Sequence, residues 1–223
     1  MNSLRDDQRL MALLDQLHGQ SDAQETVMRA YLADEGARST VGTPDELAAG
    51  RAFWRDKFVA LERDKASFCY ALCRALRARC IIEAGTSYGV STLYLAAAVR
   101  DNGGGTVIGT EYEPAKVAIA RANFAAAGLA AHIDLREGDL RETLKIINEP
   151  VDFLLLDIWT PMATPVIQLV AKHLRQGAIV VADNTARHRT NYRDLFAFLE
   201  DPANGFITQT LPFNGGLEMS VKL

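Results

Sequence analysis

The sequence predicts an α/β fold in which helices cover both faces of a mostly parallel sheet. Beyond residue 79, apolar runs of strand length alternate with segments of helical periodicity, an order typical of strand–helix–strand units. Two of these runs, residues 151–157 and 178–183, are apolar almost throughout, as expected for strands covered on both faces. Right-handed crossovers between such strands produce an open, doubly wound sheet.

The N-terminal part lacks this alternation and is predicted to be helical. Leucines between residues 10 and 17 follow the spacing of an amphipathic helix, and Ser21 or Asp22 could cap a second one. The segment TPDE at residues 43–46 has the pattern of a third helix start. The apolar stripes of these helices would serve as a cover or lid on the core, or as a dimer contact.

An apolar stripe continues toward the core. Trp54, Phe58 and Leu61 are expected on one face of the helix that begins at TPDE. The three cysteines, at positions 69, 73 and 80, match no common zinc pattern, so we expect buried thiols.

The elements of the core can be placed in order. Strands are predicted at residues 80–84, 106–111, 132–137, 151–157 and 178–183, and helices near 90–100, 114–128, 139–147 and 162–175. Residues 206–211 and 217–223 flank PFNGG, which is a hairpin signal. We therefore expect seven strands, ending in an antiparallel C-terminal hairpin. Residues 1–223 would form one domain, with a helical cover (1–79) and an α/β core (80–223).

Composition and charge exclude several classes of protein. Of the 223 residues, 48% are apolar and 23% are charged, which is ordinary for a soluble globular protein. The net charge of −4 gives no general attraction to nucleic acid or to anionic membranes. The first residues lack the apolar core of a signal peptide, and no apolar run reaches transmembrane length. A cytoplasmic protein is therefore expected.

The turn after the first core strand carries the clearest chemical signal. It has the form Glu83-x-Gly85-x-x-x-Gly89 and leads into a helix that begins near Ser91. Glycines let the backbone turn tightly and let a ligand approach closely. The dinucleotide pattern G-x-G-x-x-G is absent, which disfavours a nicotinamide-dependent dehydrogenase. Glu83 would repel a pyrophosphate but could accept a hydrogen bond from an ammonium group.

The ligand that fits this turn has an amino-acid end. Free N–H groups at the helix start could hold a carboxylate while Glu83 holds the ammonium. Glu111 ends the second strand about 20 residues beyond Gly89, where nucleotide-binding folds hold ribose hydroxyls. Residues 137–139, EGD, end the third strand and could border an adenine ring. An amino acid joined to a ribose describes S-adenosylmethionine.

These motifs resemble those of the class I S-adenosylmethionine-dependent methyltransferases, and more narrowly of the catechol O-methyltransferase-like family. The resemblance covers roughly residues 64–223 and rests on four segments in order: EAGTSYGVST, GTEYEP, LLLDIWTP and VVADNT. It implies a Rossmann-like fold, S-adenosylmethionine as the methyl donor and a homodimer. The cofactor-binding residues that it implies are Glu83, Gly85, Thr86, Ser91, Glu111, Gly138, Asp139 and Asp157.

A divalent metal site is expected at the ends of the fourth and fifth strands. Asp157, Asp183 and Asn184 offer only oxygen ligands, which suit Mg²⁺ better than zinc. Such an ion could chelate two adjacent hydroxyls and lower the pKa of one of them. The alternative is that Asp183 and Asn184 cap a strand and turn. The family resemblance favours the metal.

The sequence departs from the family beside this site. Members often carry a lysine three residues after the first metal aspartate, and here that position is Thr160. His188 has a suitable pKa for a general base, although a surface histidine in a basic loop is an equal alternative. Trp159 and Thr160 would line the acceptor pocket by resemblance.

The predicted function is methyl transfer from S-adenosylmethionine to a hydroxyl of a small, aromatic or catechol-like acceptor, assisted by Mg²⁺. Asp157 and His188 are the predicted catalytic residues. A metal-independent O- or N-methyltransferase is the main alternative, which Thr160 motivates. A non-catalytic cofactor-binding protein is a further one.

Overall fold

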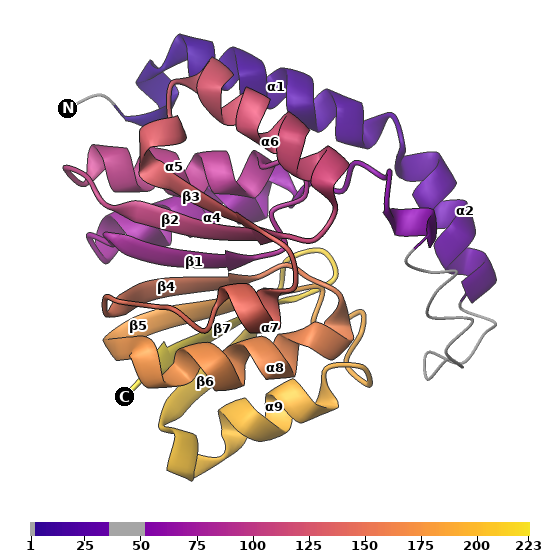
Figure 1. The fold of residues 1–223 in the computed structure, drawn as a ribbon. Helices are drawn as coiled ribbons and strands as arrows, with labels where there is room; N and C mark the ends of the chain where they lie inside the picture. The colour runs from indigo at the N-terminus through magenta and orange to yellow at the C-terminus, as the bar shows by residue number, and fades with distance from the viewer. Residues whose placement is uncertain (1–2, 36–51) are drawn as a thin grey trace.

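The computed structural model describes residues 3–35 and 52–223, without the side chains of Leu32, Asp34 and Glu35, and its centre is a seven-stranded sheet (Figure 1). The strands lie in the order β3-β2-β1-β4-β5-β7-β6. The first five are parallel, whereas β7 is antiparallel to both β5 and β6. Their bounds are β1 Cys80–Ala84, β2 Thr106–Glu111, β3 Ile133–Glu137, β4 Val151–Leu156, β5 Leu174–Asp183, β6 Phe206–Leu211 and β7 Leu217–Lys222. The predicted fold class is confirmed.

Helices cover both faces of this sheet (Figure 1). The α-helices are α1 Gln8–Asp22, α2 Glu25–Glu35, α4 Arg63–Ala75, α5 Val90–Asp101, α6 Pro114–Ala127, α7 Leu140–Thr143, α8 Thr160–Val170 and α9 Arg193–Glu200. Short 3₁₀ turns are η1 Leu4–Asp6, η2 Ala130–His132, η3 Ala171–His173 and η4 Pro202–Asn204. Helices α1, α4, α5 and α6 pack on one face and α7, α8 and α9 on the other.

Alternate residues of each strand feed the two apolar layers. Ile81, Phe153 and Leu155 belong to the layer under α1, α4, α5 and α6, whereas Ile82 and Leu154 belong to the other layer. Because side chains of successive strand residues point to opposite faces, a strand with both faces covered must be apolar at every position. The strand order reverses between β1 and β4, which are neighbours in the sheet. Their carboxyl ends lie side by side, at the place where this fold binds ligands.

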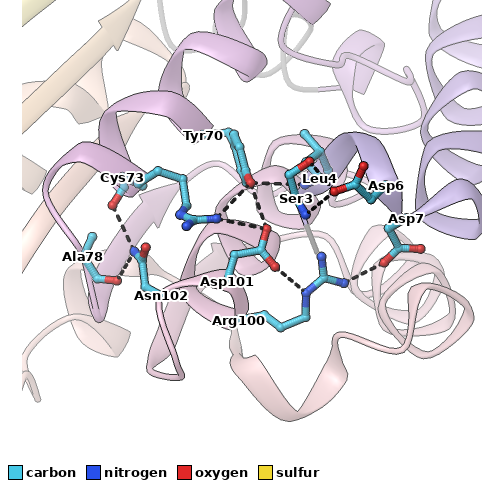
Figure 2. Close-up of polar contacts among 11 residues, drawn as sticks. Ser3, Leu4, Asp6, Asp7, Tyr70, Cys73, Ala78, Arg100, Asp101 and Asn102 are labelled. Carbon is cyan, nitrogen blue, oxygen red and sulfur yellow. Dashed lines mark hydrogen bonds and ion pairs between the residues drawn. The ribbon is translucent and has the colours of Figure 1, made fainter. Parts of the chain in front are cut away.

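The N-terminal segment is fixed to helices α4 and α5 by a polar network (Figure 2). Arg100 donates to Asp7 at 2.6 Å, and the backbone N–H of Leu4 donates to the hydroxyl of Tyr70 at 3.2 Å. Tyr70 in turn donates to Asp101 at 2.8 Å. Buried leucines of α1 join the same apolar layer as α5. The helical cover thus contacts the core directly. The boundary at residue 79 between cover and core stays a prediction.

The prediction of one helix through Trp54, Phe58 and Leu61 is wrong, because residues 57–62 are irregular. Side chains at the end of α1 form hydrogen bonds with backbone N–H and carbonyl groups that would otherwise pair within a helix. Ser21 donates to the carbonyl of Phe58 and accepts from the N–H of Ala60. Gln24 accepts from the N–H of Phe58 at 3.0 Å. Ser21 therefore lies inside α1 and does not cap a second helix.

Three further boundaries differ from the prediction. The helix predicted near 162–175 ends at Val170, where a short 3₁₀ turn, η3, follows it. The helix predicted over 139–147 spans only α7, because the Arg136 guanidinium donates to the carbonyls of Thr143 and Ile146 at 2.7 Å each. Strand β5 begins four residues before the predicted 178. The predicted helix start at residues 43–46 lies outside the described residues.

Within the described ranges, no helix is long and apolar enough to cross a membrane. All three cysteines are buried free thiols, as predicted.

Candidate active site

The turn between β1 and α5 is closed tightly against the end of β4. Gly85 has φ +97°, and a Cβ there would lie 2.0 Å from the carbonyl oxygen of Asp157. Gly89 has φ +87°, and its Cβ would lie 2.3 Å from the ring of Phe124. Only glycine fits both positions, since side chains rarely adopt such φ values and no space exists for one. The turn therefore brings bare backbone to the carboxyl edge of the sheet.

Glu83 is fully buried beneath this turn and only half of its carboxylate is paired. Its Oε2 accepts hydrogen bonds from the hydroxyls of Thr86, at 2.9 Å, and Thr92. Its Oε1 finds no hydrogen-bond partner among the described residues. Burial raises the pKa of Glu83, and the hydroxyls of Ser91, Thr92 and Thr86 lower it in part. The Ser91 hydroxyl lies near the carboxylate but is not placed to donate to Oε1. A buried carboxylate oxygen without a donor is an acceptor prepared for a ligand.

A second unpaired group lies in the same turn. The hydroxyl of Ser87 is buried without a partner in the described part of the chain. Ser87 has φ +49°, and its backbone N–H donates to Glu111 at 2.8 Å. Two unpaired polar atoms, on Glu83 and Ser87, thus flank one glycine turn. This arrangement fits a polar ligand that donates to both.

Glu111 is held rigidly at the end of β2. Its Oε1 accepts from the backbone N–H groups of Tyr112 and Glu113 at 2.9 Å each, and its Oε2 accepts from Ser87. Each carboxylate oxygen has a further lone pair available for a ligand hydroxyl. Gly109, two residues before Glu111, leaves room for the Thr86 side chain. A Cβ on Gly109 would lie 2.5 Å from the hydroxyl oxygen of Thr86.

The predicted adenine neighbours lie at the end of β3. The N–H of Gly138 donates to the carbonyl of Glu111 at 2.9 Å, so the ends of β2 and β3 are joined. Asp139 caps α7 by accepting from the N–H of Arg141 and pairs with the Arg141 guanidinium at 2.5 Å. The carboxylate of Asp139 therefore has a local structural role, whereas Gly138 lies directly beside the Glu111 backbone.

The ends of β4 and β5 carry the two predicted metal aspartates. The N–H of Asp157 donates to the carbonyl of Ala84 at 3.1 Å, which places Asp157 beside the β1 turn. Burial, followed by repulsion from Asp183, raises the pKa of Asp157 well above its usual range. Burial also raises the pKa of Asp183, to about 6, although attraction to Lys65 opposes it. The sheet has brought these carboxylates together, as the sequence predicts.

Asp183 is already paired with a cation from the protein. The Nζ of Lys65, on α4, donates to Asp183 Oδ1 at 2.5 Å and lies 2.9 Å from Glu62. The other oxygen, Oδ2, accepts from the side-chain N–H of Asn184 at 2.6 Å. Asn184 therefore turns its amide nitrogen toward Asp183. A Cβ on Gly215 would lie 2.3 Å from its Oδ1, so this oxygen faces the 212–216 loop.

These contacts do not fit a divalent ion at the predicted set. An ion there could use the buried Oδ1 of Asn184, which has no hydrogen-bond partner among the described residues. At Asp183, however, it would meet the Lys65 ammonium, 2.5 Å from Oδ1, and the Asn184 N–H on Oδ2. Three or more clustered His, Cys, Asp or Glu side chains would be an alternative metal site, and the described residues contain no such group. The Mg²⁺ expected from the sequence stays a prediction, and the geometry favours its metal-independent alternative.

The remaining predicted site residues lie around Asp157 and Asn184. Trp159 and Thr160 are half-buried where the chain enters α8. The N–H of His188 donates to the carbonyl of Asn184 at 3.0 Å, and burial lowers the pKa of its imidazole. The C-terminal hairpin loop joins this segment, since the carbonyl of Gly215 accepts from the N–H groups of Ala186 and Arg187.

Several residues of the site were not predicted. Thr92 and Ser87 complete the environment of Glu83, and the segment that gave Glu83 contains both of them. Tyr192 is buried near the two aspartates, whose charges, after burial, raise the pKa of its hydroxyl. Lys65 comes from the cover, 118 residues before Asp183, and its helical spacing carries no signal of this contact.

Comparison with known proteins matches this chain to methyltransferases. A family profile described as a methyltransferase domain matches residues 82–185, from β1 to the end of β5. A protein named as an O-methyltransferase from Mycolicibacterium smegmatis is 31% identical over 152 residues, covering 60% of this chain and 70% of that protein. The chain belongs to the S-adenosylmethionine-dependent O-methyltransferase family.

Other members of this O-methyltransferase family match over shorter stretches. Catechol O-methyltransferases from Niastella koreensis and Mycobacterium tuberculosis are each 31% identical, over 133 and 130 residues. The matches cover 58% of this chain in both cases, and 59% and 58% of those relatives. The chain thus spans less than two thirds of the length of these two proteins.

Solved structures show the same methyltransferase fold. The cofactor-bound protein Rv0187 from MTB has a TM-score of 0.68 and 26% identity, covering 87% of this chain and 95% of that one. The O-methyltransferase from Bacillus cereus in complex with SAH has a TM-score of 0.69 at 22% identity, covering 88% and 97%. The second likeness supports the fold alone.

Proposed function

We propose that the chain transfers a methyl group from S-adenosylmethionine to a hydroxyl oxygen of a small, aromatic or catechol-like acceptor. The observation that carries this proposal is the unpaired Oε1 of Glu83, buried at the carboxyl end of β1. A buried carboxylate oxygen without a donor is costly unless a ligand donates to it. The ammonium group of the methyl donor is such a ligand, and Glu111, on the adjacent strand, suits its ribose hydroxyls.

The residues of the turn would bind and orient the donor. Gly85 and Gly89 allow close approach of its methionine end, and the Ser87 hydroxyl offers a further polar contact. Glu111, fixed by three backbone N–H groups, needs no rearrangement to accept from a ribose diol. When bound, S-adenosylmethionine supplies a methyl group activated by its sulfonium. The chain contributes by holding donor and acceptor in line and by excluding water.

The acceptor would lie beside Asp157, Trp159 and Thr160, at the junction of β4 and α8. His188 remains the candidate base for the hydroxyl proton. Burial and the nearby Arg187 charge lower its pKa, so its imidazole is neutral near pH 7 and able to accept a proton. The contacts of Lys65 support methyl transfer without a metal, which the sequence gives as the alternative. A homodimer and a cytoplasmic location also stay predictions.

Calorimetric titration tests the donor. We expect S-adenosylmethionine and its demethylated product to bind and NAD to give no heat. Binding of NAD alone would contradict the proposal and point to a dehydrogenase. A screen of catechols, phenols and hydroxylated heterocycles with labelled donor then tests the reaction. Binding of the donor with no turnover of any acceptor would support a non-catalytic binding protein.

A further inference from the structure

A buried ion pair ties the helical cover to the predicted metal segment. Lys65 is fully buried on α4, and its ammonium donates to Asp183, at the end of β5, at 2.5 Å. Asp183 is itself only 3% exposed. Lysine is almost never fully buried unless it is paired, and breaking such a pair leaves an uncompensated charge in the interior. The contact is therefore a fixed part of the site.

The charges around Lys65 show what its ammonium balances. Glu62 lies 2.9 Å from Nζ on one side and Asp183 on the other, and Asp157 lies close enough to feel the charges of all three. Glu62 and Asp183 thus share one resident cation, and Asp157 feels its charge. Without Lys65, Asp183 and Asp157 would lose the cation that balances them. Together with the unpaired Oδ1 of Asn184 they would offer oxygen ligands of the kind that Mg²⁺ and Mn²⁺ prefer.

We propose that the Lys65 ammonium takes the place of a divalent ion beside Asp157 and Asp183, so that the site works without a metal. Lys65 is a positioning residue, because its buried ammonium acts through Asp183 and not by touching the acceptor. What the proposal says about the choice of acceptor rests on the proposed methyltransferase function. A divalent ion selects acceptors with two adjacent oxygens that chelate it. With Lys65 in place, acceptors with a single hydroxyl are as suitable as catechols.

The fixed neighbours of Asp183 agree with this assignment. Its second oxygen accepts from Asn184, so both oxygens are paired without a metal. Asn184 holds φ +56°, a left-handed conformation that asparagine adopts more readily than most residues, and its backbone carbonyl accepts from His188. Replacing Lys65 with a metal would require Asp183 and Asn184 to turn, within a segment that Gly215 and Gly216 also contact closely.

Binding of Mn²⁺, followed by electron paramagnetic resonance, tests the cation site without any acceptor. We expect the wild-type protein to leave Mn²⁺ free and the Lys65→Ala variant to bind it at least about tenfold more tightly. Lys65→Arg keeps the positive charge and should behave like the wild type. Lys116→Ala is the matched control, since Lys116 is also buried but donates to a backbone carbonyl, that of Trp54 at 3.1 Å. It should gain no Mn²⁺ affinity.

Turnover with and without a chelator is the second arm. Wild-type turnover should change less than about twofold after chelation, and a phenol and the corresponding catechol should give kcat/KM values within about tenfold of each other. Tight Mn²⁺ binding by the wild-type protein, or turnover that chelation abolishes and Mg²⁺ restores, would overturn the proposal. If Lys65→Ala does not fold, the wild-type Mn²⁺ measurement alone decides. Failure to turn over any acceptor would refute the methyltransferase function and leave the Mn²⁺ result intact.

Discussion

Gly85 is the residue at which the β1 turn passes closest to β4. We expect Gly85→Ala to weaken binding of the demethylated donor and to lower the free energy of unfolding, because the new Cβ would overlap the Asp157 carbonyl. Gly103→Ala is a matched control, since Gly103 has nearly the same φ, +94°, with nothing within 4 Å. The difference between the two variants should be about 1–3 kcal/mol in urea denaturation.

Equal stability and equal affinity of the two variants would contradict the close approach of Gly85 to Asp157. Both substitutions place alanine at a positive φ, so that backbone strain of about 1–2 kcal/mol is common to them and cancels in the comparison. What remains measures the space at Gly85 alone.

Glu83 offers a test of how the donor is held. Glu83→Gln keeps the shape of the side chain but removes the charge that would face an ammonium group. We expect affinity for S-adenosylmethionine to fall by about tenfold to a hundredfold, the worth of a hydrogen bond to a charged group. Glu200→Gln, at an exposed position on α9, is the control and should leave affinity unchanged. Unchanged affinity in Glu83→Gln, measured by calorimetry, would place the ammonium elsewhere.

The residues of the site differ in how far the sequence could predict them. Glu83, Glu111, Asp157 and Asp183 each follow or end an apolar strand, so the rule that ligands bind at the carboxyl ends of strands locates them. Lys65 has no such marker. A lysine near the start of an amphipathic helix is normally solvated, and only the tertiary fold shows that α4 turns it toward Asp183.

At the scale of elements, the docking of the N-terminal segment depends on Asp101. Its carboxylate, 3% exposed, accepts from Tyr70 at 2.8 Å and pairs with Arg100 at 2.9 Å and Arg74 at 3.4 Å (Figure 2). We expect Asp101→Ala to cost about 3 kcal/mol, because it leaves the partly buried Arg74 guanidinium without a carboxylate, Arg100 with Asp7 alone and the Tyr70 hydroxyl without its acceptor. Urea denaturation measures the cost, and faster proteolysis before residue 22 would accompany it.

A matched change at an exposed ion pair provides the control for Asp101. Glu25 pairs with Arg29 at 2.5 Å on α2, where both side chains are more than half exposed. Glu25→Ala should therefore change stability by less than about 0.5 kcal/mol. If the Asp101 and Glu25 variants lose the same stability, the network in Figure 2 does not hold the cover to the core.

The strands and helices of the core were predicted well where the pattern of apolar residues is enough to locate them. All seven strands were found, because alternating strands and helices of the core keep their periods from end to end. Two of the helices that were wrong or too long, the one through Phe58 and the one over 139–147, fail for a common reason. Distant side chains, Ser21 and Gln24 in one case and Arg136 in the other, take backbone groups that a longer helix would need. Periodicity carries no information on such competition.

At the scale of the whole molecule, the sheet order follows from rules that the sequence can use. Right-handed crossovers and short connections leave few arrangements of five parallel strands, and the apolar runs identify the buried ones. The placement of the cover does not follow in the same way. Its helices pack on the core through apolar side chains and through buried polar residues, such as Lys65 and His18, whose partners lie far away along the chain.

His18 couples this packing of the cover to pH. On α1 it is 3% exposed, and its Nε2 lies 3.2 Å from the Tyr94 hydroxyl on α5. Burial, followed by the charge of Arg63, lowers the pKa of His18 from 6.5 to about 4. The unfolded chain takes up this proton near pH 6.5 and the folded protein only near pH 4. The stabilisation is therefore complete above pH 6.5 and is lost as the pH falls toward 4.

The fall in pKa corresponds to about 3 kcal/mol of unfolding free energy across this pH range. We expect His18→Gln to be less stable than the wild type near pH 7 but to lose less stability on acidification, because glutamine has no proton to take up. Gln20→Ala, at an exposed position on the same helix, is the control and should keep the wild-type slope. Urea denaturation at a series of pH values between about 4 and 7 measures all three proteins. Parallel curves for the wild type and His18→Gln would show that protonation of His18 does not release the cover.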